Sequence, residues 1–284
     1  MKPAPFDYHR VDTVEDALER LGELGDDAKV LAGGQSLVPM MNFRIVRPPA
    51  LVDITRVPDL KYVARDDGTL RIGALALHRE IEHADDDLLG GFGVLKAAAP
   101  LVGHFPIRAR GTFGGSVAHG DPASEWCMLT MLLDGEIVAR GPDGERIIPA
   151  ADFFLGFFTT ALEPGEILTE VRLADPPDGA AIEEFARRHG DFAIVAAAAA
   201  IDVEDGACTR ARVVVGGVDE VPLRVEAAEE VLAGSDLGAE AIEEAAQAAA
   251  RAVEPGSDIH GSAEYRKKLT AVLLRRALTR AVGR

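Results

Sequence analysis

Apolar residues recur along the chain with both helical and strand-like spacing, and the first 55 residues show the two together. Thr13, with Asp16 three positions later, is typical of a helix start, and apolar residues then follow at helical intervals. Residues 28–32 and 51–54 are short apolar runs bounded by turn residues, which is the pattern of buried strands. The region predicts a small βαβ-like unit in which a pair of glycines follows the first strand.

Residues 56–178 predict hairpins and short helices, and so a second part of the same domain. Apolar and polar residues alternate over 62–76, which predicts a hairpin with its turn at Asp67-Gly68. A second hairpin is expected at 136–149. A helix is expected after Asp121-Pro122, with Asp121 as its cap. Residues 173–179 are rich in proline, aspartate and glycine, so a domain boundary is expected near residue 178.

Residues 179–284 predict a smaller domain of mixed helix and sheet. Strands are expected at 193–203 and 210–215, in a three-stranded sheet. Helical patterns follow at 224–233, 239–253 and 262–281, where runs of alanine favour close packing. The fold class expected for the chain is therefore α+β, with domains at 1–178 (parts 1–55 and 56–178) and 179–284.

Composition narrows the function classes. The 284 residues are 48% apolar, enough for two packed cores, and carry a formal net charge of −17. That charge argues against binding to nucleic acid or to an anionic membrane surface. Neither a signal peptide nor an apolar run long enough to span a membrane is recognisable, so a cytoplasmic protein is expected.

The cysteines exclude one class of site. The chain has two cysteines, Cys127 and Cys208, which are 81 positions apart in the sequence. They form no Cys-x-x-Cys pair and cannot supply the four ligands of an iron–sulfur cluster. A chain of this composition that handles electrons must therefore obtain any cluster from a partner.

Two glycine doublets are the candidate chemistry of the chain. Gly33-Gly34 is followed by Gln35 and Ser36, and Gly114-Gly115 is followed by Ser116. Glycines allow close approach of the backbone, whose N–H groups then form a concavity for an anion such as phosphate. The dinucleotide pattern Gly-x-Gly-x-x-Gly is absent after the first strand, so a doubly wound nucleotide-binding fold is not expected.

Six stretches in order along the chain carry a family resemblance. The chain resembles the FAD-binding medium subunit of molybdenum hydroxylases, of the aerobic carbon monoxide dehydrogenase and xanthine dehydrogenase type. The resemblance implies a two-part FAD-binding domain of the vanillyl-alcohol-oxidase-like type, followed by a domain characteristic of this subunit. The stretches are AGGQSLVPMMNFR (32–44), PIRARGTFGGSVAHGDPASE (106–125), DFFLGFFTTALEPGEIL (152–168), RRHGDFAIV (187–195), VVVGGVDEVPLR (213–224) and EYRKKL (264–269).

The resemblance implies roles for particular residues in holding FAD. The first phosphate loop would be Ala32, Gly33, Gly34, Gln35, Ser36 and Leu37; the second would be Thr112, Gly114, Gly115 and Ser116. Gln35 stands where some related flavoproteins attach FAD through histidine, so non-covalent FAD is expected. Asp121 would bind hydroxyls of FAD, with a purely capping role as the alternative. Arg188 would approach the flavin ring, or else be a solvated surface residue.

The resemblance also implies partners. A large subunit would hold a molybdenum cofactor, a small subunit would hold two 2Fe–2S clusters, and the complex would be a dimer of heterotrimers. This chain would receive electrons from the clusters and pass them to an external acceptor, with no catalytic residue and no metal of its own.

Two other functions compete with this one. A metal-dependent hydrolase would use His104, His119 and Asp121, and a scaffold would keep the fold without flavin. The phenylalanines within 153–158 fit either a buried helix or turn, or a contact with flavin or a partner.

Overall fold

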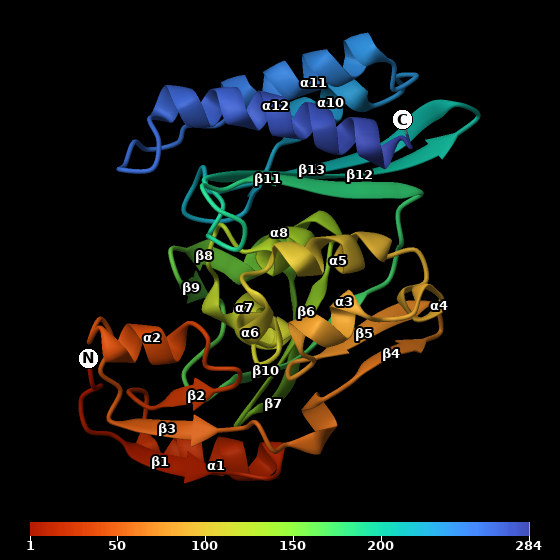
Figure 1. Cartoon of the computed structure of the whole chain (residues 1–284). Coiled ribbons are helices and arrows are strands. Elements are labelled where there is room, and N and C mark those ends of the chain that lie inside the picture. The colour runs from red at the N-terminus through yellow and green to blue at the C-terminus, as the bar shows by residue number, and fades with distance from the viewer. Residues whose placement is uncertain (284) are drawn as a thin grey trace.

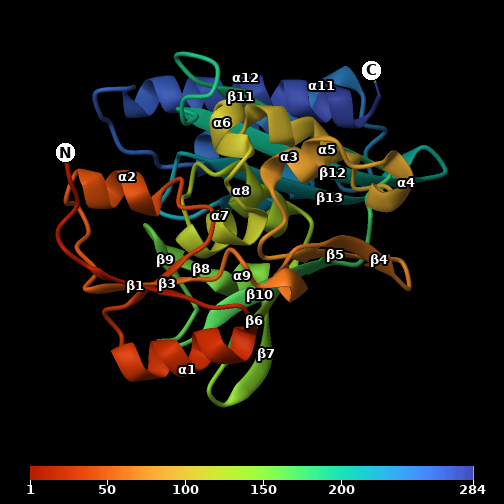
Figure 2. The same cartoon turned by 60° about the horizontal axis from the view of Figure 1, so that its bottom comes forward.

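The three larger sheets lie one above another in the computed structural model, which describes residues 1–283 (Figure 1). The N-terminal sheet and the C-terminal helices lie at opposite ends, as a second view also shows for α1 (Val14–Leu24) and α12 (Ala263–Ala281) (Figure 2). The predicted mixture of helix and sheet is confirmed. No helix in the described part of the chain combines the length and apolar character needed to cross a membrane.

The N-terminal sheet is parallel, with the strand order β1-β3-β2. Thr13 caps α1 as predicted, because its hydroxyl accepts a 3.0 Å hydrogen bond from the N–H of Asp16. The glycine loop follows the strand that was predicted at 28–32, as expected. The sequence missed one earlier strand, at residues 7–10, which pairs with the strand at 50–53. The elements are β1 (Asp7–Arg10), α1, β2 (Lys29–Leu31), α2 (Leu37–Asn42) and β3 (Ala50–Asp53).

The middle sheet has the order β4-β5-β10-β6-β7, and both predicted hairpins are present in it. Its strands are β4 (Val63–Asp66), β5 (Thr69–Gly73), β6 (Glu136–Gly141), β7 (Gly144–Pro149) and β10 (Ile167–Leu173). Short helices connect them: α3 (His78–Glu82), α4 (Asp86–Leu89), α5 (Gly93–Ala98), α6 (Phe105–Arg108), α7 (Phe113–His119), α8 (Glu125–Leu132) and α9 (Ala150–Phe153). Two 3₁₀ turns, Pro58–Leu60 and Ala99–Leu101, complete this region.

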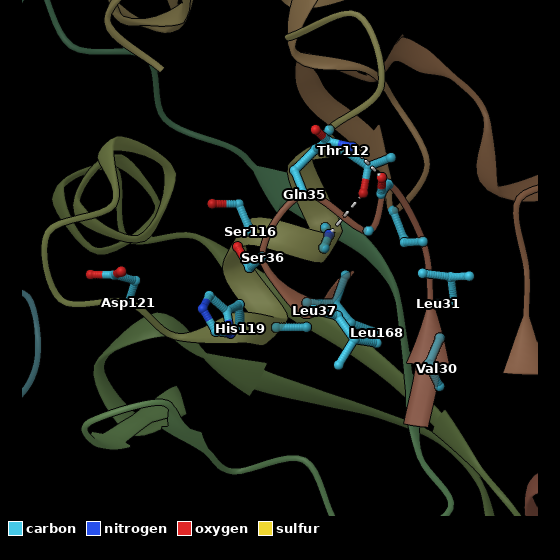
Figure 3. A pocket seen from close by; sticks show the side chains of 18 of the residues that line it. Val30, Leu31, Gln35, Ser36, Leu37, Thr112, Ser116, His119, Asp121 and Leu168 are labelled. Atoms are coloured by element: carbon cyan, nitrogen blue, oxygen red, sulfur yellow. Dashed lines mark hydrogen bonds between the residues drawn. The ribbon is translucent and has the colours of Figure 1, made fainter. Parts of the chain in front are cut away.

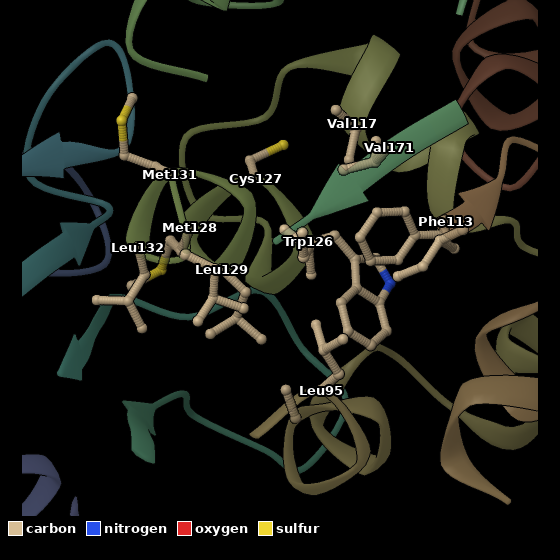
Figure 4. Close-up of a cluster of buried hydrophobic side chains, with 14 of the residues drawn as sticks. Leu95, Phe113, Val117, Trp126, Cys127, Met128, Leu129, Met131, Leu132 and Val171 are labelled. Carbon is tan, nitrogen blue, oxygen red and sulfur yellow. The ribbon is translucent and has the colours of Figure 1, made fainter. Parts of the chain in front are cut away.

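Helix α8 is the centre of the largest core. Every residue from Trp126 to Leu132 is buried, and Trp126 packs on Phe113 with ring centroids 5.0 Å apart (Figure 4). The predicted helix start at Asp121 was wrong. The Asp121 carboxylate accepts a 2.9 Å bond from the N–H of Ala123 in a local turn, so the helix begins at Glu125 with Ser124 before it.

The C-terminal sheet has four strands, one more than expected, in the order β11-β12-β13-β14. Its second strand contains the alanine run 196–200, all of it fully buried, because the sheet contacts α8 on one face and α12 on the other. Small side chains let both layers approach closely. The elements are β11 (Gly179–Phe185), β12 (Val195–Glu204), β13 (Ala207–Gly216), β14 (Leu223–Arg224), α10 (Glu226–Leu232), α11 (Ala239–Ala252) and α12.

The phenylalanines within 153–158 fit both alternatives, because two of them are buried and two are exposed. Phe153 and Phe154 are buried, the second in β8 (Phe154–Gly156), which pairs with β9 (Thr159–Thr160). Phe157 and Phe158 are more than half exposed at the turn between these strands. The first pair belongs to the core, and the second pair is available to a ligand or a partner.

Candidate functional site

A cavity of about 600 Å³ lies between the β2–α2 segment and helix α7, within the size range of small-molecule sites. Eleven of the twelve predicted site residues line it, and Figure 3 shows several of them. Residues 190–192 of the C-terminal region also border it. The predicted residues in its wall are Ala32, Gly33, Gly34, Gln35, Ser36, Leu37, Thr112, Gly114, Gly115, Ser116 and Asp121.

The first glycine doublet leaves a row of backbone donors free. The N–H groups of Gly34, Gln35 and Ser36 make no hydrogen bond to any group in residues 1–283. Gly34 has a φ of +70°, which favours glycine, and the amide of Gln35 donates to the carbonyl of Gly33 over 2.8 Å (Figure 3). Consecutive free N–H groups in such a turn attract an anion, and phosphate oxygens suit them.

The second glycine doublet is the first turn of α7, although a loop was expected. Thr112 caps this helix, because its hydroxyl oxygen accepts a 3.1 Å bond from the N–H of Gly115. Gly114 packs on the chain: a Cβ there would come within 2.5 Å of the Ala74 Cα. The doublet is therefore needed first for packing this helix against the middle sheet.

The two glycine segments touch each other. A Cβ added to Gly33 would lie 2.4 Å from the carbonyl oxygen of Arg110 and 2.7 Å from the Cα of Gly111. Both distances are far below van der Waals contact, and both neighbours are backbone atoms. At this point the cavity wall consists of two backbone segments in direct contact, with no side chain between them.

Polar side chains follow the wall beyond the helix. The hydroxyls of Ser116 and Ser124 share a 2.8 Å hydrogen bond. Burial raises the pKa of Asp121 and lowers that of His119, whose ring stacks on Phe158 at a centroid distance of 4.8 Å. The histidine is therefore neutral at physiological pH. Asp121 uses Oδ1 to accept the bond from Ala123, so its other carboxylate oxygen can accept a hydrogen bond from a ligand.

Arg188 lies elsewhere. It lines a second cavity, of about 1050 Å³, that adjoins the first. The two cavities share four wall residues, among them the exposed Phe192. The structure thus places Arg188 in the neighbouring space, where Asp121 is the one other predicted site residue among those that line the second cavity.

Several titratable residues of the wall were missed from the sequence, and two of them have strongly shifted pKa values. His78 and Glu125 both line the first cavity. Burial, with the nearby carboxylate of Glu184, raises the pKa of Glu125 to about 8. Glu184 comes from β11 in the C-terminal sheet, so no local spacing in the sequence joins it to Glu125.

Glu184→Gln should remove part of the pH dependence of stability. Burial raises the pKa of Glu184 from 4.5 to about 7, and its Oε2 atom is buried without a hydrogen bond in the described residues. The folded chain therefore holds this proton more tightly than the unfolded chain, and stability falls as pH rises from 4.5 through 7. At pH 8 the glutamine variant should be more stable by roughly 1–3 kcal/mol, a range lowered for partial exposure.

Thermal denaturation of the ligand-free chain between pH 5 and 9 measures this effect. Glu230→Gln, which removes the same charge at an exposed position of α10, is the matched control. Equal pH slopes for wild type and Glu184→Gln would contradict the assignment.

The hydrolase alternative lacks a metal-binding cluster. His119 and Asp121 line the first cavity, whereas His104 lies against Gly190 outside that lining. Across residues 1–283, no group of three or more His, Cys, Asp or Glu side chains is placed to hold a metal ion.

The donor set fits FAD. The free N–H row of residues 34–36 matches an anionic pyrophosphate, and the serine and aspartate side chains match hydroxyl groups. Gln35 cannot form the covalent bond to flavin that histidine forms in some flavoproteins.

Comparison with known proteins gives a consistent family. Residues 4–176 match the model of the FAD binding domain in molybdopterin dehydrogenase, and residues 180–281 match the CO dehydrogenase flavoprotein C-terminal domain. The 6-hydroxypseudooxynicotine dehydrogenase complex subunit alpha of Paenarthrobacter nicotinovorans is 42% identical, over 100% of this chain and 97% of that protein.

Carbon monoxide dehydrogenases are similar in both sequence and structure. The medium chain of the Afipia carboxidovorans enzyme is 38% identical over 100% of this chain and 99% of its own length. A chain of the solved enzyme from Hydrogenophaga pseudoflava superposes with a TM-score of 0.95 at 36% identity, over 100% and 99% of the two chains. This chain therefore belongs to the FAD-binding medium subunits of the molybdopterin dehydrogenase family, which are subunits of oxidoreductases.

Proposed function

We propose that this chain passes electrons from the 2Fe–2S clusters of a partner subunit to an external acceptor, through FAD held non-covalently in the first cavity. The row of free N–H groups at residues 34–36 is the observation that carries the proposal, because consecutive free N–H groups suit the phosphates of a ligand such as FAD. FAD supplies a ring system that takes up and releases two electrons. The chain's own part is to bind and orient it.

The proposed binding residues act through backbone and side chain. Gly33 and Gly34 would shape the turn, and Ser36 and Ser116 would donate hydroxyl hydrogen bonds. Asp121 would accept from FAD hydroxyls with its remaining carboxylate capacity. The remaining residues of the proposed site are Ala32, Gln35, Leu37, Thr112, Gly114, Gly115 and Arg188.

Arg188 has a separate proposed role, because it lines the adjoining cavity. A guanidinium there would favour the negative charge that reduced flavin carries. We also propose that residues 1–178 and 179–284 are the two domains, with the second covering the FAD-binding first.

The proposed partners follow from the division of cofactors. Cys127 and Cys208 are both buried and free, and burial raises the pKa of the Cys127 thiol, so neither suits a cluster. A small subunit would carry two 2Fe–2S clusters and a large subunit the molybdenum cofactor, in a cytoplasmic dimer of heterotrimers. The similar proteins act on substrates as different as carbon monoxide and a nicotine derivative, so the substrate would be set by the large subunit.

Purified alone, the chain should be yellow and release about one FAD per chain on denaturation. Added to its two partner subunits under anaerobic conditions, it should lose its flavin absorbance when the substrate of the large subunit is supplied. Omitting the small subunit is the control, and should leave the flavin oxidised. A chain that stays colourless after incubation with FAD would support a flavin-free scaffold; a flavin that stays oxidised in the full complex would refute the electron route.

A further inference from the structure

His78 is a buried histidine in the wall of the first cavity. It is 4% exposed and begins α3, and its backbone N–H donates to the carbonyl of Gly111 over 3.1 Å. That bond ties the start of α3 to the segment that precedes α7. The imidazole is thereby held beside the place where the two glycine segments touch.

Trp126 fixes the protonation of this ring. Its Nε1–H donates a 2.9 Å hydrogen bond to His78 Nδ1, and both side chains are buried. An indole N–H can only donate, so Nδ1 must carry a lone pair. Burial, together with the positive charge of Arg108, lowers the His78 pKa to about 4, so the ring is neutral at physiological pH. A neutral imidazole with an unprotonated Nδ1 carries its proton on Nε2.

Within the described residues, the Nε2–H group is the unpaired donor of this ring. It has no hydrogen-bond partner within residues 1–283, yet it is not among the unpartnered polar atoms that are sealed from solvent. It therefore keeps access to the cavity that His78 lines. A Cβ on Gly111 would come within 2.5 Å of Nε2, so this donor lies next to Gly111, where the glycine segments touch.

We propose that His78 is a further FAD-binding residue, whose Nε2–H donates to an acceptor oxygen of FAD and whose ring is oriented by Trp126. The inference rests on the proposed function, since it takes FAD to be the ligand of this cavity. A purely structural histidine would satisfy Trp126 in the same way but would make no contact with the ligand. A structural role needs only Nδ1, which accepts from Trp126, whereas a role in FAD binding also needs the Nε2–H donor.

Two substitutions separate the ring nitrogens. His78→Asn keeps an acceptor near the position of Nδ1 for Trp126 and loses the donor at Nε2. His78→Gln places an amide donor near the position of Nε2. The asparagine variant should weaken FAD binding about tenfold, as expected for one lost hydrogen bond, and the glutamine variant should recover to within about threefold of wild type.

Titration of the ligand-free chains with FAD measures these affinities, and their melting temperatures without FAD report any structural damage. Nitrogen NMR of histidine-labelled wild type gives a second readout, in which the His78 Nε2–H signal should move on addition of FAD. Wild-type affinity in both variants, or an Nε2 signal unchanged by bound FAD, would overturn the inference alone. A wild-type chain that binds no FAD would overturn the proposed function and this inference with it.

Discussion

Gly33→Ala should weaken FAD binding strongly, with the affinity for FAD falling roughly a hundredfold. The added methyl would lie 2.4 Å from the Arg110 carbonyl oxygen and 2.7 Å from the Gly111 Cα. Backbone cannot rotate away as the end of a side chain can, so the two glycine segments must separate. Overpacking of this kind costs about 1–3 kcal/mol, and the row of N–H groups at 34–36 loses its position as well.

Gly22→Ala is the matched control for this variant. Gly22 lies within α1, where an added Cβ would meet nothing within 4 Å, so the variant should bind FAD normally and be more stable by about 0.5–1 kcal/mol. Flavin content after gel filtration, with FAD titration of each ligand-free chain, measures the outcome. Full flavin content in Gly33→Ala would show that the contact between the segments does not shape the site.

Local sequence patterns predicted the parts of the site that depend on neighbours in the chain. The Gly33-Gly34 turn was found because glycine tolerates the positive φ that the turn requires at Gly34. Helix α7 was missed because glycine is a poor helix former, although Thr112 and the N–H of Gly115 make a cap at the expected spacing. The Asp121 start was wrong because its side chain satisfies a turn before the helix begins.

Contacts between distant segments could not be predicted. The bond from Trp126 to His78 spans 48 residues, and the repulsion between Glu125 in α8 and Glu184 in β11 acts between segments far apart in the chain. The strand at residues 7–10 was not predicted, because it forms by pairing with residues 50–53 in a parallel register that no periodicity encodes. The resemblance supplied the site residues, and only the structure placed Arg188 in the adjoining cavity.

Asp134→Asn should destabilise the fold by about 2–4 kcal/mol, because Asp134 neutralises a buried arginine. Asp134 lies between α8 and β6, and its carboxylate accepts from Arg210 and Arg224 over 2.6 Å and from Arg212 over 3.4 Å. The Arg212 side chain is only 1% exposed. Burial lowers its pKa, yet a guanidinium stays charged at physiological pH.

The contact joins the middle region to the C-terminal sheet, since Arg212 lies in β13. The other carboxylate near Arg212 is that of Asp202, at 3.5 Å, and neither Nε nor Nη2 has a hydrogen bond within the described residues. Asparagine keeps the shape of the side chain and tolerates the positive φ of 48° at this position, so the variant isolates the lost charge. Urea denaturation measures the change, with Asp143→Asn in the exposed β6–β7 turn as control.

A second substitution tests whether the buried charge is the cause. Arg212→Met fills a similar volume without a charge, and such replacements in buried ion pairs are often neutral or stabilising. Combined with Asp134→Asn, it should recover most of the lost stability if the penalty comes from an uncompensated guanidinium. If the double variant is as unstable as Asp134→Asn alone, the loss must come from the hydrogen bonds to Arg210 and Arg224, and the buried charge of Arg212 is already neutralised by Asp202.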